Sequence, residues 1–404
     1  MESALLIIGA GPAGLLAAWS AAQLRPAGGI RVLDRLPAAG AKLAVTGGGR
    51  GNLSHVSSEE EFAAAFGKHG RFTIPAFRAL PPDALRALFH RLGVPTIVDE
   101  AGRVYPQTQS AAGVRDALFA ACKKSGVEFA LGQAVKTLAP PAAPGRPWRV
   151  DDGQARTVLL AAGGQSAAHL GSDGSGFSLA RALGHDVVHP VPALAPLPTV
   201  ERWPVRHSGL SLPDVALTLP GKPAETIRGE ILFTHRGLSG PAVLNLSGRV
   251  ARRLQTVPEA RLELRLLPEP PDFRNLRRSA GVRSIAAWLA QQIPRALADT
   301  LLELAGIAPG HTFARLSAAQ ETALRQQLTA LPLTVRATGG FAESMVTAGG
   351  VSLKQVRSDT LESRLHPGLY FAGEILDLDG PTGGWNLQWA FCSGVLAGTC
   401  AARG

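Results

Sequence analysis

The stretch LLIIGAGPAGLLAAWSAAQ, residues 5–23, joins an apolar run to small apolar residues at helical spacing through Gly9, Gly11 and Gly14. In such a turn the first glycine permits a tight strand-to-helix connection, the second lets backbone approach a pyrophosphate, and the third lets the helix pack on the sheet. A second apolar stretch, IRVLD, ends in Asp34, twenty residues after Gly14. In dinucleotide-binding folds, a carboxylate at this spacing accepts hydrogen bonds from the ribose hydroxyls. The pattern predicts a Rossmann-like α/β domain that binds a dinucleotide; the alternative is a glycine-rich turn without a ligand.

Composition indicates a soluble globular protein of two or three domains. The chain has 404 residues, of which 46% are hydrophobic and 18% charged. Its apolar runs are shorter than a membrane span, and ALLIIGA lacks the flanks of a signal peptide. Cys122, Cys392 and Cys400 show no CxxC spacing, which favours a reducing compartment. We therefore expect a cytoplasmic protein with no membrane partner and no metal site.

The formal net charge of +10 is concentrated in the middle of the chain. Residues 191–337 hold 18 Lys and Arg against 11 Asp and Glu. This excess indicates an acidic substrate, a nucleotide or RNA as a partner. Compositional drift is the alternative, because 34 of the 41 basic residues are arginine.

A second glycine-rich stretch, KLAVTGGGRGNLSH, covers residues 42–55. Its glycines would let backbone lie flat against a ring or a phosphate, and they are too costly in entropy for an ordinary helix or strand. Arg50 would add a fixed positive charge, and Asn52 a donor and an acceptor. The GKS or GKT of a P-loop is absent. Its place just after the acidic strand favours FAD over NAD; a flexible surface loop is the alternative.

Two later strand ends complete the expected cofactor site. TVLLAAGGQS ends in small residues at 161–164, where open α/β sheets place ligands. GLYFAGEILDLDGPTGGWNLQ predicts a strand over 369–372 and a helix that begins near Asn386 and stabilises negative charge on a flavin. Glu374 or Asp377 would bond the ribityl hydroxyls, or both acids are simply solvated.

Beyond Val191 the sequence changes to short alternating strands broken by Pro and Gly, which indicates a barrel or a sandwich. Residues 273–331 have a mostly helical pattern. We therefore expect a discontinuous Rossmann-like FAD-binding domain with an inserted β-barrel and a small helical subdomain. The predicted bounds are 1–190 and 346–404 for the FAD-binding domain, 191–271 for the barrel, 272–330 for the helices, and 331–345 for the return strands of the insert.

The chain resembles the bacterial FAD-dependent oxidoreductases similar to aminoacetone oxidase and to the BaiN and YhiN flavoproteins. The matching stretches include IIGAGPAGLLAA, GAKLAVTGGGRGNLSH, GRVYPQTQSAAGVRDAL, GEILFTHRGLSGPAVL and GLYFAGEILDLDGPTGGWNLQWAFCSG, in order along nearly the whole chain. The resemblance implies noncovalent FAD held by Gly9, Gly11, Pro12, Ala13, Gly14, Asp34, Arg35, Lys42, Gly48, Gly49, Arg50, Gly51, Asn52, Val135, Ala162, Gly163, Gly164, Gly373, Glu374, Asp377, Gly383, Gly384, Asn386, Leu387 and Gln388.

The resemblance also implies the chemistry. In a reductase of this family, hydride passes from reduced flavin to a C=C conjugated to a carbonyl. The substrate would be an enone or a uridine-like compound. We expect NAD(P)H as the electron donor. We hypothesise that His235 or Tyr105 is the proton donor and that Arg50 or Asn52 polarises the carbonyl. His235 could equally be a core histidine. The family usually has Cys where this chain has Gly51, so a thiol is absent at that position.

Two alternatives remain open. One is an oxidase that consumes an amine and O2. The other is an FAD-containing RNA- or partner-binding protein that acts through the basic insert, whose FRNLRRSAGVR segment contains Arg274, Arg277, Arg278 and Arg283.

Overall fold

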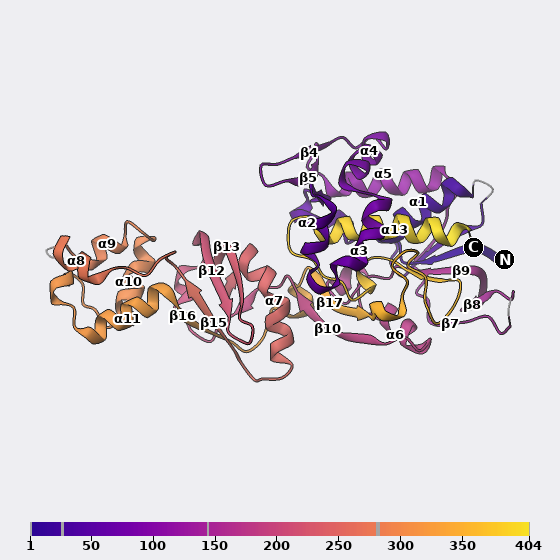
Figure 1. Ribbon diagram of the computed structural model, residues 1–404. Helices are drawn as coiled ribbons and strands as arrows, with labels where there is room; N and C mark the ends of the chain where they lie inside the picture. Colours follow the sequence, from indigo (N-terminus) through magenta and orange to yellow (C-terminus); the bar gives the residue numbers. More distant parts are fainter. Residues whose placement is uncertain (1, 26–27, 144, 280–282, 404) are drawn as a thin grey trace. The chain divides into compact units, whose positions relative to one another are not determined.

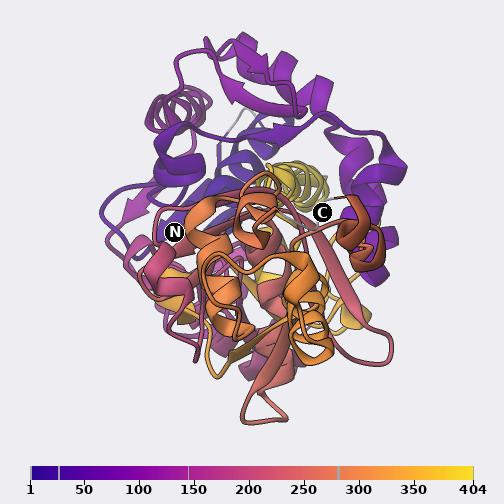
Figure 2. The ribbon, with the colours of Figure 1, turned by 90° about the vertical axis from the view of Figure 1, so that its left-hand side faces the viewer.

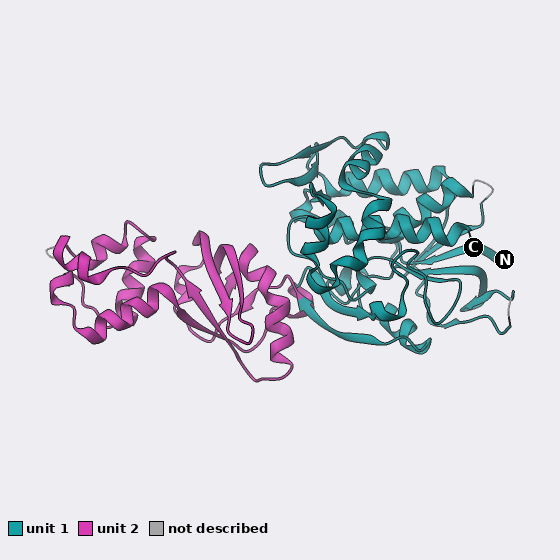
Figure 3. Cartoon of the chain, viewed as in Figure 1, with its two compact units in different colours: residues 1–192, 344–404 teal, residues 193–343 magenta. Residues whose placement is uncertain are grey.

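The computed structural model describes residues 2–25, 28–143, 145–279 and 283–403. The chain divides into two compact units, residues 1–192 with 344–404 and residues 193–343 (Figure 3). Unit 1 is therefore built from both ends of the sequence, and unit 2 is an insertion. In the described part of the chain, no helix has both the length and the apolar character needed to cross a membrane.

Unit 1 is organised by parallel strands whose carboxyl ends meet at one edge. Their order is β6-β2-β1-β9, and β18 pairs with β9. The strands β1 and β9 are almost wholly apolar toward their carboxyl ends, as expected of strands covered on both faces. The bounds are β1 (Glu2–Ile8), β2 (Ile30–Asp34), β6 (Glu128–Leu131), β9 (Gly153–Leu160) and β18 (Leu369–Phe371). Both glycine-rich strand ends and Asp34 thus reach the same edge of the sheet.

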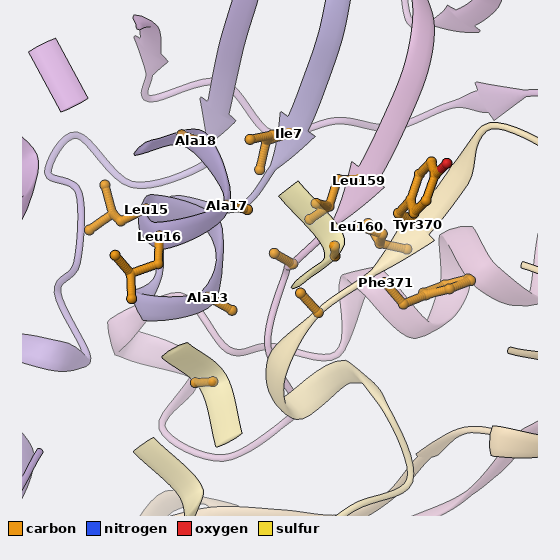
Figure 4. Packing of buried hydrophobic residues seen from close by; sticks show 14 of the residues in the cluster. Ile7, Ala13, Leu15, Leu16, Ala17, Ala18, Leu159, Leu160, Tyr370 and Phe371 are labelled. Carbon is orange, nitrogen blue, oxygen red and sulfur yellow. The ribbon is translucent and has the colours of Figure 1, made fainter. Parts of the chain in front are cut away.

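Two helices from opposite ends of the sequence pack against each other in unit 1 (Figure 1). They are α1 (Pro12–Leu24) and α13 (Trp385–Arg403). A Cβ on Gly394 or Gly398 would lie 2.3 Å from the carbonyl oxygen of Ala13 or Ala17 respectively, so the backbones are in direct contact. The side chains labelled in Figure 4 come from β1, α1, β9 and β18 and belong to the core that these elements share.

Other elements of unit 1 agree with the local sequence signals. In α5 (Ala111–Lys124), Ser110 Oγ accepts a hydrogen bond from Gly113 N and caps the helix. Cys122 is fully buried, and burial raises the pKa of its thiol to about 12, so it is a core residue. The remaining elements are η1 (Leu43–Gly49), β3 (Ser54–His55), α2 (Glu59–Ala65), η2 (Gly67–His69), α3 (Gly70–Ala79), α4 (Pro82–Arg91), β4 (Thr96–Val98), β5 (Arg103–Pro106), β7 (Leu138–Ala139), β8 (Trp148–Val150), η3 (Ala168–Leu170), α6 (Ser175–Ala182), β10 (Val187–Ala193), β17 (Val346–Val351), η6 (Leu353–Gln355) and η7 (Gly373–Ile375).

Unit 2 contains an antiparallel six-stranded sheet in the order β11-β14-β13-β12-β15-β16. Val200 N, just past β11, donates to Thr334 O in β16 at 2.8 Å, so a backbone hydrogen bond links the first and last strands of the sheet. In β15 buried and exposed residues alternate strictly. The bounds are β11 (Leu197–Pro198), β12 (Ser211–Leu219), β13 (Glu225–Thr234), β14 (Gly237–Ser239), β15 (Ala260–Arg265) and β16 (Leu331–Val335).

The helices of unit 2 share a hydrophobic core with its sheet. They are η4 (Pro204–His207), α7 (Pro241–Leu254), α8 (Phe273–Ser279), α9 (Ile285–Leu289), α10 (Arg295–Leu304), η5 (Phe313–Arg315) and α11 (Ala318–Thr329). Figure 2 shows the later helices, α8 to α11, in orange. A single helical turn, α12 (Gly340–Glu343), stands where the sequence suggests a return strand. Unit 2 thus has an interior of its own.

Candidate active site

The three glycines of the first turn have different surroundings. Gly9 has φ +108°, and a Cβ there would lie 2.3 Å from Ala161 O; a Cβ on Gly14 would lie 1.9 Å from Gly9 O. A Cβ on Gly11 would have no heavy atom within 4 Å. Gly9 and Gly14 therefore permit close packing, whereas Gly11 leaves open space at the N-terminus of α1. Among the described residues, no side chain caps that terminus, so its first amides lack a side-chain partner.

Asp34 holds the end of β2 against the first turn. Its Oδ2 accepts from Ala10 N at 2.6 Å and its Oδ1 from Leu36 N at 2.8 Å. The neighbouring Arg35 pairs with Asp173, in the turn before α6. Val135 lies half-buried in the segment after β6. Each oxygen of Asp34 can accept a further hydrogen bond, so the carboxylate can still bind a ribose hydroxyl.

The second glycine-rich stretch adopts a backbone that only glycines take up easily. Gly47, Gly48, Gly49 and Gly51 all have φ between +59° and +85°, and the helical turn η1 is broken at Thr46. A Cβ on Gly48 or Gly49 would meet nothing within 4 Å. At Gly48 and Gly49 the loop therefore exposes backbone, which a flat ligand could approach closely.

Gly51, where the resemblance implies a Cys, lies in a closely packed part of the glycine loop. A Cβ there would lie 3.1 Å from Ala111 Cα and 3.3 Å from Pro106 Cδ. A side chain at Gly51 would therefore be closely packed. The backbone there also has a left-handed conformation, with φ +78°.

Two of the predicted catalytic residues lie together. The Cζ atom of Arg50 is 5.2 Å from the centroid of the Tyr105 ring, a cation–π contact. Arg50 is exposed at the end of the glycine loop, and Tyr105 is buried in β5. Arg50 Nε also donates to Gly47 O at 3.3 Å, which ties the guanidinium to the loop.

The glycine loop is joined to the start of α13. In its favoured amide orientation, Asn52 donates to Ser54 O (3.1 Å) and accepts from Gly384 N (3.2 Å). His55 Nδ1 lies 3.2 Å from Gly383 O, and its ring stacks on Trp385 at 4.5 Å. A Cβ on Gly384 would lie 2.3 Å from Ser54 O, so a larger residue there would separate the two segments.

Side chains at the start of α13 serve mainly to hold this arrangement. Asn386 bonds Gly380 N and O and also Pro381 O. Gln388 is buried; its Oε1 accepts from Ser54 Oγ and its Nε2 donates to Leu80 O. Leu387 packs partly against the core.

The carboxyl edge of β9 and β18 adds a charged pair. Lys42 Nζ lies 2.7 Å from Glu374 Oε2. A Cβ on Gly373 would meet the methyl of Ala13 at 2.9 Å, and one on Gly163 would meet Ser172 Oγ at 2.7 Å. Ala162 and Gly163 lie half-buried at this edge. Asp377 Oδ2 lies 3.9 Å from His69 Nε2.

These features fit a dinucleotide with a flat ring system. Open positions at Gly11, Gly48 and Gly49 give backbone access, the uncapped N-terminus of α1 suits a pyrophosphate, and Asp34 suits a ribose. Sequence reasoning missed the residues that join these parts, among them His55, Ser166, Asp173 and Thr347. Their partners are distant in sequence, so no local pattern marks them.

The remaining candidates belong to unit 2. His235 is exposed in the turn between β13 and β14. Arg274, Arg278 and Arg283 are exposed too, whereas Arg277 pairs with Glu321 at 2.8 Å. Residues 280–282 of that basic segment lie outside the described residues. The role of His235 at the flavin stays a prediction.

Known proteins resemble this chain over its whole length. It is 32% identical to the 3-dehydro-bile acid delta(4,6)-reductase of Clostridium scindens, over 98% of both chains. It is 31% identical to the ribosomal RNA dihydrouridine synthase of Escherichia coli, over 96% of this chain and 95% of that one.

Two solved structures share its fold. One is the 3-ketosteroid delta1-dehydrogenase of Sterolibacterium denitrificans, with a TM-score of 0.54 and 14% identity, over all of this chain and 99% of that one. The other is a flavocytochrome c3 fumarate reductase, with a TM-score of 0.52 and 16% identity, over all of this chain and 78% of that one. The family profile described as HI0933-like protein Rossmann domain matches residues 3–400. The chain therefore belongs to the HI0933-like family and is an FAD-dependent oxidoreductase with a Rossmann-type fold.

Proposed function

We propose that the protein is a reductase that delivers hydride from reduced FAD to a C=C conjugated to a carbonyl. The observation that carries this proposal is the similarity to the delta(4,6)-reductase across 98% of both chains. Dihydrouridine is uridine with one ring C=C reduced, so the name of the second relative denotes chemistry of the same form. The open backbone around Gly11, Gly48 and Gly49 supports the placement of the cofactor at this edge of unit 1.

When bound, FAD supplies the two-electron redox chemistry, and the protein positions the reactants and moves the proton. Of the two residues expected to polarise the carbonyl, we favour Arg50, because the amide of Asn52 already holds Ser54 and Gly384. Of the two expected proton donors, we favour Tyr105, because the Arg50 guanidinium over its ring would stabilise the charge left on the phenol oxygen.

This assignment is tested by Tyr105→Phe and His235→Ala, with the flavin and substrate half-reactions followed separately. We expect Tyr105→Phe to slow substrate reduction by about 100-fold, the usual value of a positioned acid, while flavin reduction is unchanged. His235→Ala should leave both steps within about two-fold of the wild type. Turnover that survives both substitutions would show that neither residue is the acid.

We propose NADPH or NADH as the electron donor, bound transiently. The sequence has no second complete GxGxxG that would form a separate nicotinamide domain. The test is the visible spectrum of the purified protein during anaerobic addition of NADPH and then NADH. Rapid bleaching of the flavin band is expected. A persistent oxidised spectrum would contradict this donor and point to electrons from the substrate itself, as in an amine oxidase that uses O2.

A second candidate function is RNA binding through unit 2. The exposed Arg274, Arg278 and Arg283, together with the relative named for ribosomal RNA, favour it. Replacing all three with Gln should weaken RNA binding and reduce the slope of log K against log salt by about 0.7–0.9 per lost phosphate contact. Arg71→Gln with Arg91→Gln, two exposed arginines of unit 1, is the matched control. Equal binding by both variants would leave the cluster as a solvated helix face.

A further inference from the structure

A buried chain of hydrogen bonds lies behind the Lys42–Glu374 pair and centres on Thr347, in β17. The backbone N–H of Thr347 donates to Glu374 Oε1 at 2.7 Å, and Lys42 Nζ lies 2.7 Å from Glu374 Oε2. The Thr347 hydroxyl accepts from Gln165 N at 2.7 Å and from Ser166 N at 3.0 Å. Thr347 and Ser166 are fully buried, whereas the side chains of Lys42 and Glu374 retain 22% and 21% exposure. Thr347 therefore holds two segments of the flavin site from behind.

The direction of the remaining bonds follows from the capacity of a hydroxyl. A hydroxyl has two acceptor lone pairs and one donor hydrogen. Two amides already use both lone pairs of Thr347 Oγ1, so its hydrogen must point to Ser166 Oγ, 3.0 Å away. Ser344 Oγ also donates to Ser166 Oγ, at 2.7 Å. Every polar group of Thr347 other than its carbonyl is thus committed to this network.

Gly164 supplies the space that the network needs. A Cβ on Gly164 would lie 2.4 Å from Thr347 Oγ1 and 2.9 Å from Glu374 Oε1. The end of β9, the charged pair and β17 consequently meet within hydrogen-bond distance. Ser344 is also the residue at which the chain re-enters unit 1.

We propose that Thr347 is a positioning residue of the flavin site, which acts by holding Glu374 and the Gln165–Ser166 turn in the arrangement that FAD requires. It does so without touching the substrate. Loss of its hydroxyl removes the acceptor of the half-buried Gln165 N–H and of the buried Ser166 N–H, and the turn at Gly164 then shifts to satisfy them. The proposal deepens the flavin site within the proposed function. It depends on FAD binding at this edge and not on which substrate is reduced.

The test compares Thr347→Val, Thr347→Ser and the control Thr157→Val by titrating FAD into the apoprotein. Thr157 is also buried and lies on β9, where its hydroxyl is within hydrogen-bond distance of Ala4 O (3.0 Å) and Ala401 O (3.3 Å), outside the predicted flavin contacts. We expect Thr347→Val to raise the Kd for FAD by about ten-fold, the effect of one lost buried hydrogen-bond partner. Thr347→Ser should restore the wild-type Kd. Thr157→Val should lower the melting temperature of the apoprotein and leave the Kd unchanged.

A Kd for Thr347→Val within about two-fold of the wild type would overturn the proposal. Equal effects of Thr347→Val and Thr157→Val on the Kd would also overturn it, because the role would then be structural alone. If Thr347→Val does not fold, Ser166→Ala replaces it; this variant removes the acceptor of the Thr347 proton and should raise the Kd about three-fold. An unchanged Kd for a folded Ser166→Ala would then contradict the proposal. These experiments measure FAD binding and not substrate turnover. Their result therefore does not depend on whether the proposed substrate is correct.

Discussion

Gly11 and Gly14 lie three residues apart, yet a methyl group on each would meet different surroundings. At Gly11 it would enter open space, and at Gly14 it would lie 1.9 Å from Gly9 O. We expect Gly11→Ala to fold normally and to bind FAD at least about ten-fold more weakly, because its methyl group would occupy the place of the pyrophosphate. Gly14→Ala should instead destabilise the protein by about 1–3 kcal/mol through overpacking.

Thermal melting of the apoprotein and FAD titration separate these two effects. Gly11→Ala with wild-type FAD affinity would contradict the placement of the phosphates at this turn.

His185 provides a prediction for the effect of pH on stability. Burial, and then the nearby His366, lower the pKa of His185 from its ordinary value, while Asp186 acts in the opposite direction. Its Nε2 lies 2.8 Å from Ser363 Oγ, and the side chain is buried. The unfolded chain binds a proton at this residue more readily than the folded one, so stability should fall as pH drops below about 6.5.

Melting temperatures measured from pH 7.5 to 5.5 test this expectation. In the wild type, uptake of one proton can lower the free energy of unfolding by at most about 1.4 kcal/mol per pH unit. His185→Gln should remove up to that much of the pH-dependent decrease in stability. His169→Gln, at an exposed histidine, is the control and should behave like the wild type. If the melting temperatures of the wild type and of His185→Gln fall in parallel as pH drops, the lowered pKa of His185 would be contradicted.

The contact between α1 and α13 depends on glycines rather than on large apolar side chains. A Cβ on Gly398 would lie 2.3 Å from Ala17 O and 2.6 Å from Ser20 Oγ. The helices must separate to accept it, and α13 begins at Trp385, beside the glycine loop. We expect Gly398→Ala to lower the free energy of unfolding by about 1–3 kcal/mol and to weaken FAD binding as well.

Urea unfolding and FAD titration measure the two effects. Thr399→Ala, at the next position of the same helix, should have little effect on either, because Thr399 is only half-buried. A Gly398→Ala variant as stable as the wild type would show that the helices can separate at no cost.

Each of the two units has its own core, so the barrel unit should fold without its host. The apolar residues of unit 2 form a separate buried cluster, and the Val200–Thr334 hydrogen bond links the two edge strands of its sheet. We expect residues 193–343 expressed alone to unfold in one cooperative thermal transition and to carry no flavin. Circular dichroism and the visible spectrum check both points. An unfolded fragment would show that unit 2 depends on unit 1, and a yellow one would place flavin contacts in unit 2.

Unit 1 behaves differently because its sheet and helix pair need both ends of the chain. β18 pairs with β9, and α13 packs on α1. The host therefore cannot complete its core until the insert has been synthesised.

Local patterns determined a large part of this protein. The spacing of Gly9, Gly11 and Gly14 and the position of Asp34 predict the first turn, because backbone conformation and strand length are set by neighbouring residues. The same holds for the cap at Ser110 and for the left-handed loop after Lys42. The alternating strands and the helical stretch of the insert were also visible, since burial imposes a period of two or of 3.6 residues.

Only the tertiary structure decided which of these residues act together. It brought Arg50 to Tyr105, Asn52 to Gly384, and Lys42 to Glu374. It also placed Thr347 behind Glu374, although nothing in the surrounding VTAGGV distinguishes that threonine from any other strand residue. Hydrogen bonds such as that between Lys42 and Glu374, 332 positions apart, leave no periodic trace in the sequence. They form because unit 1 is built from both ends of the chain, which brings residues 42–52 against residues 374–384.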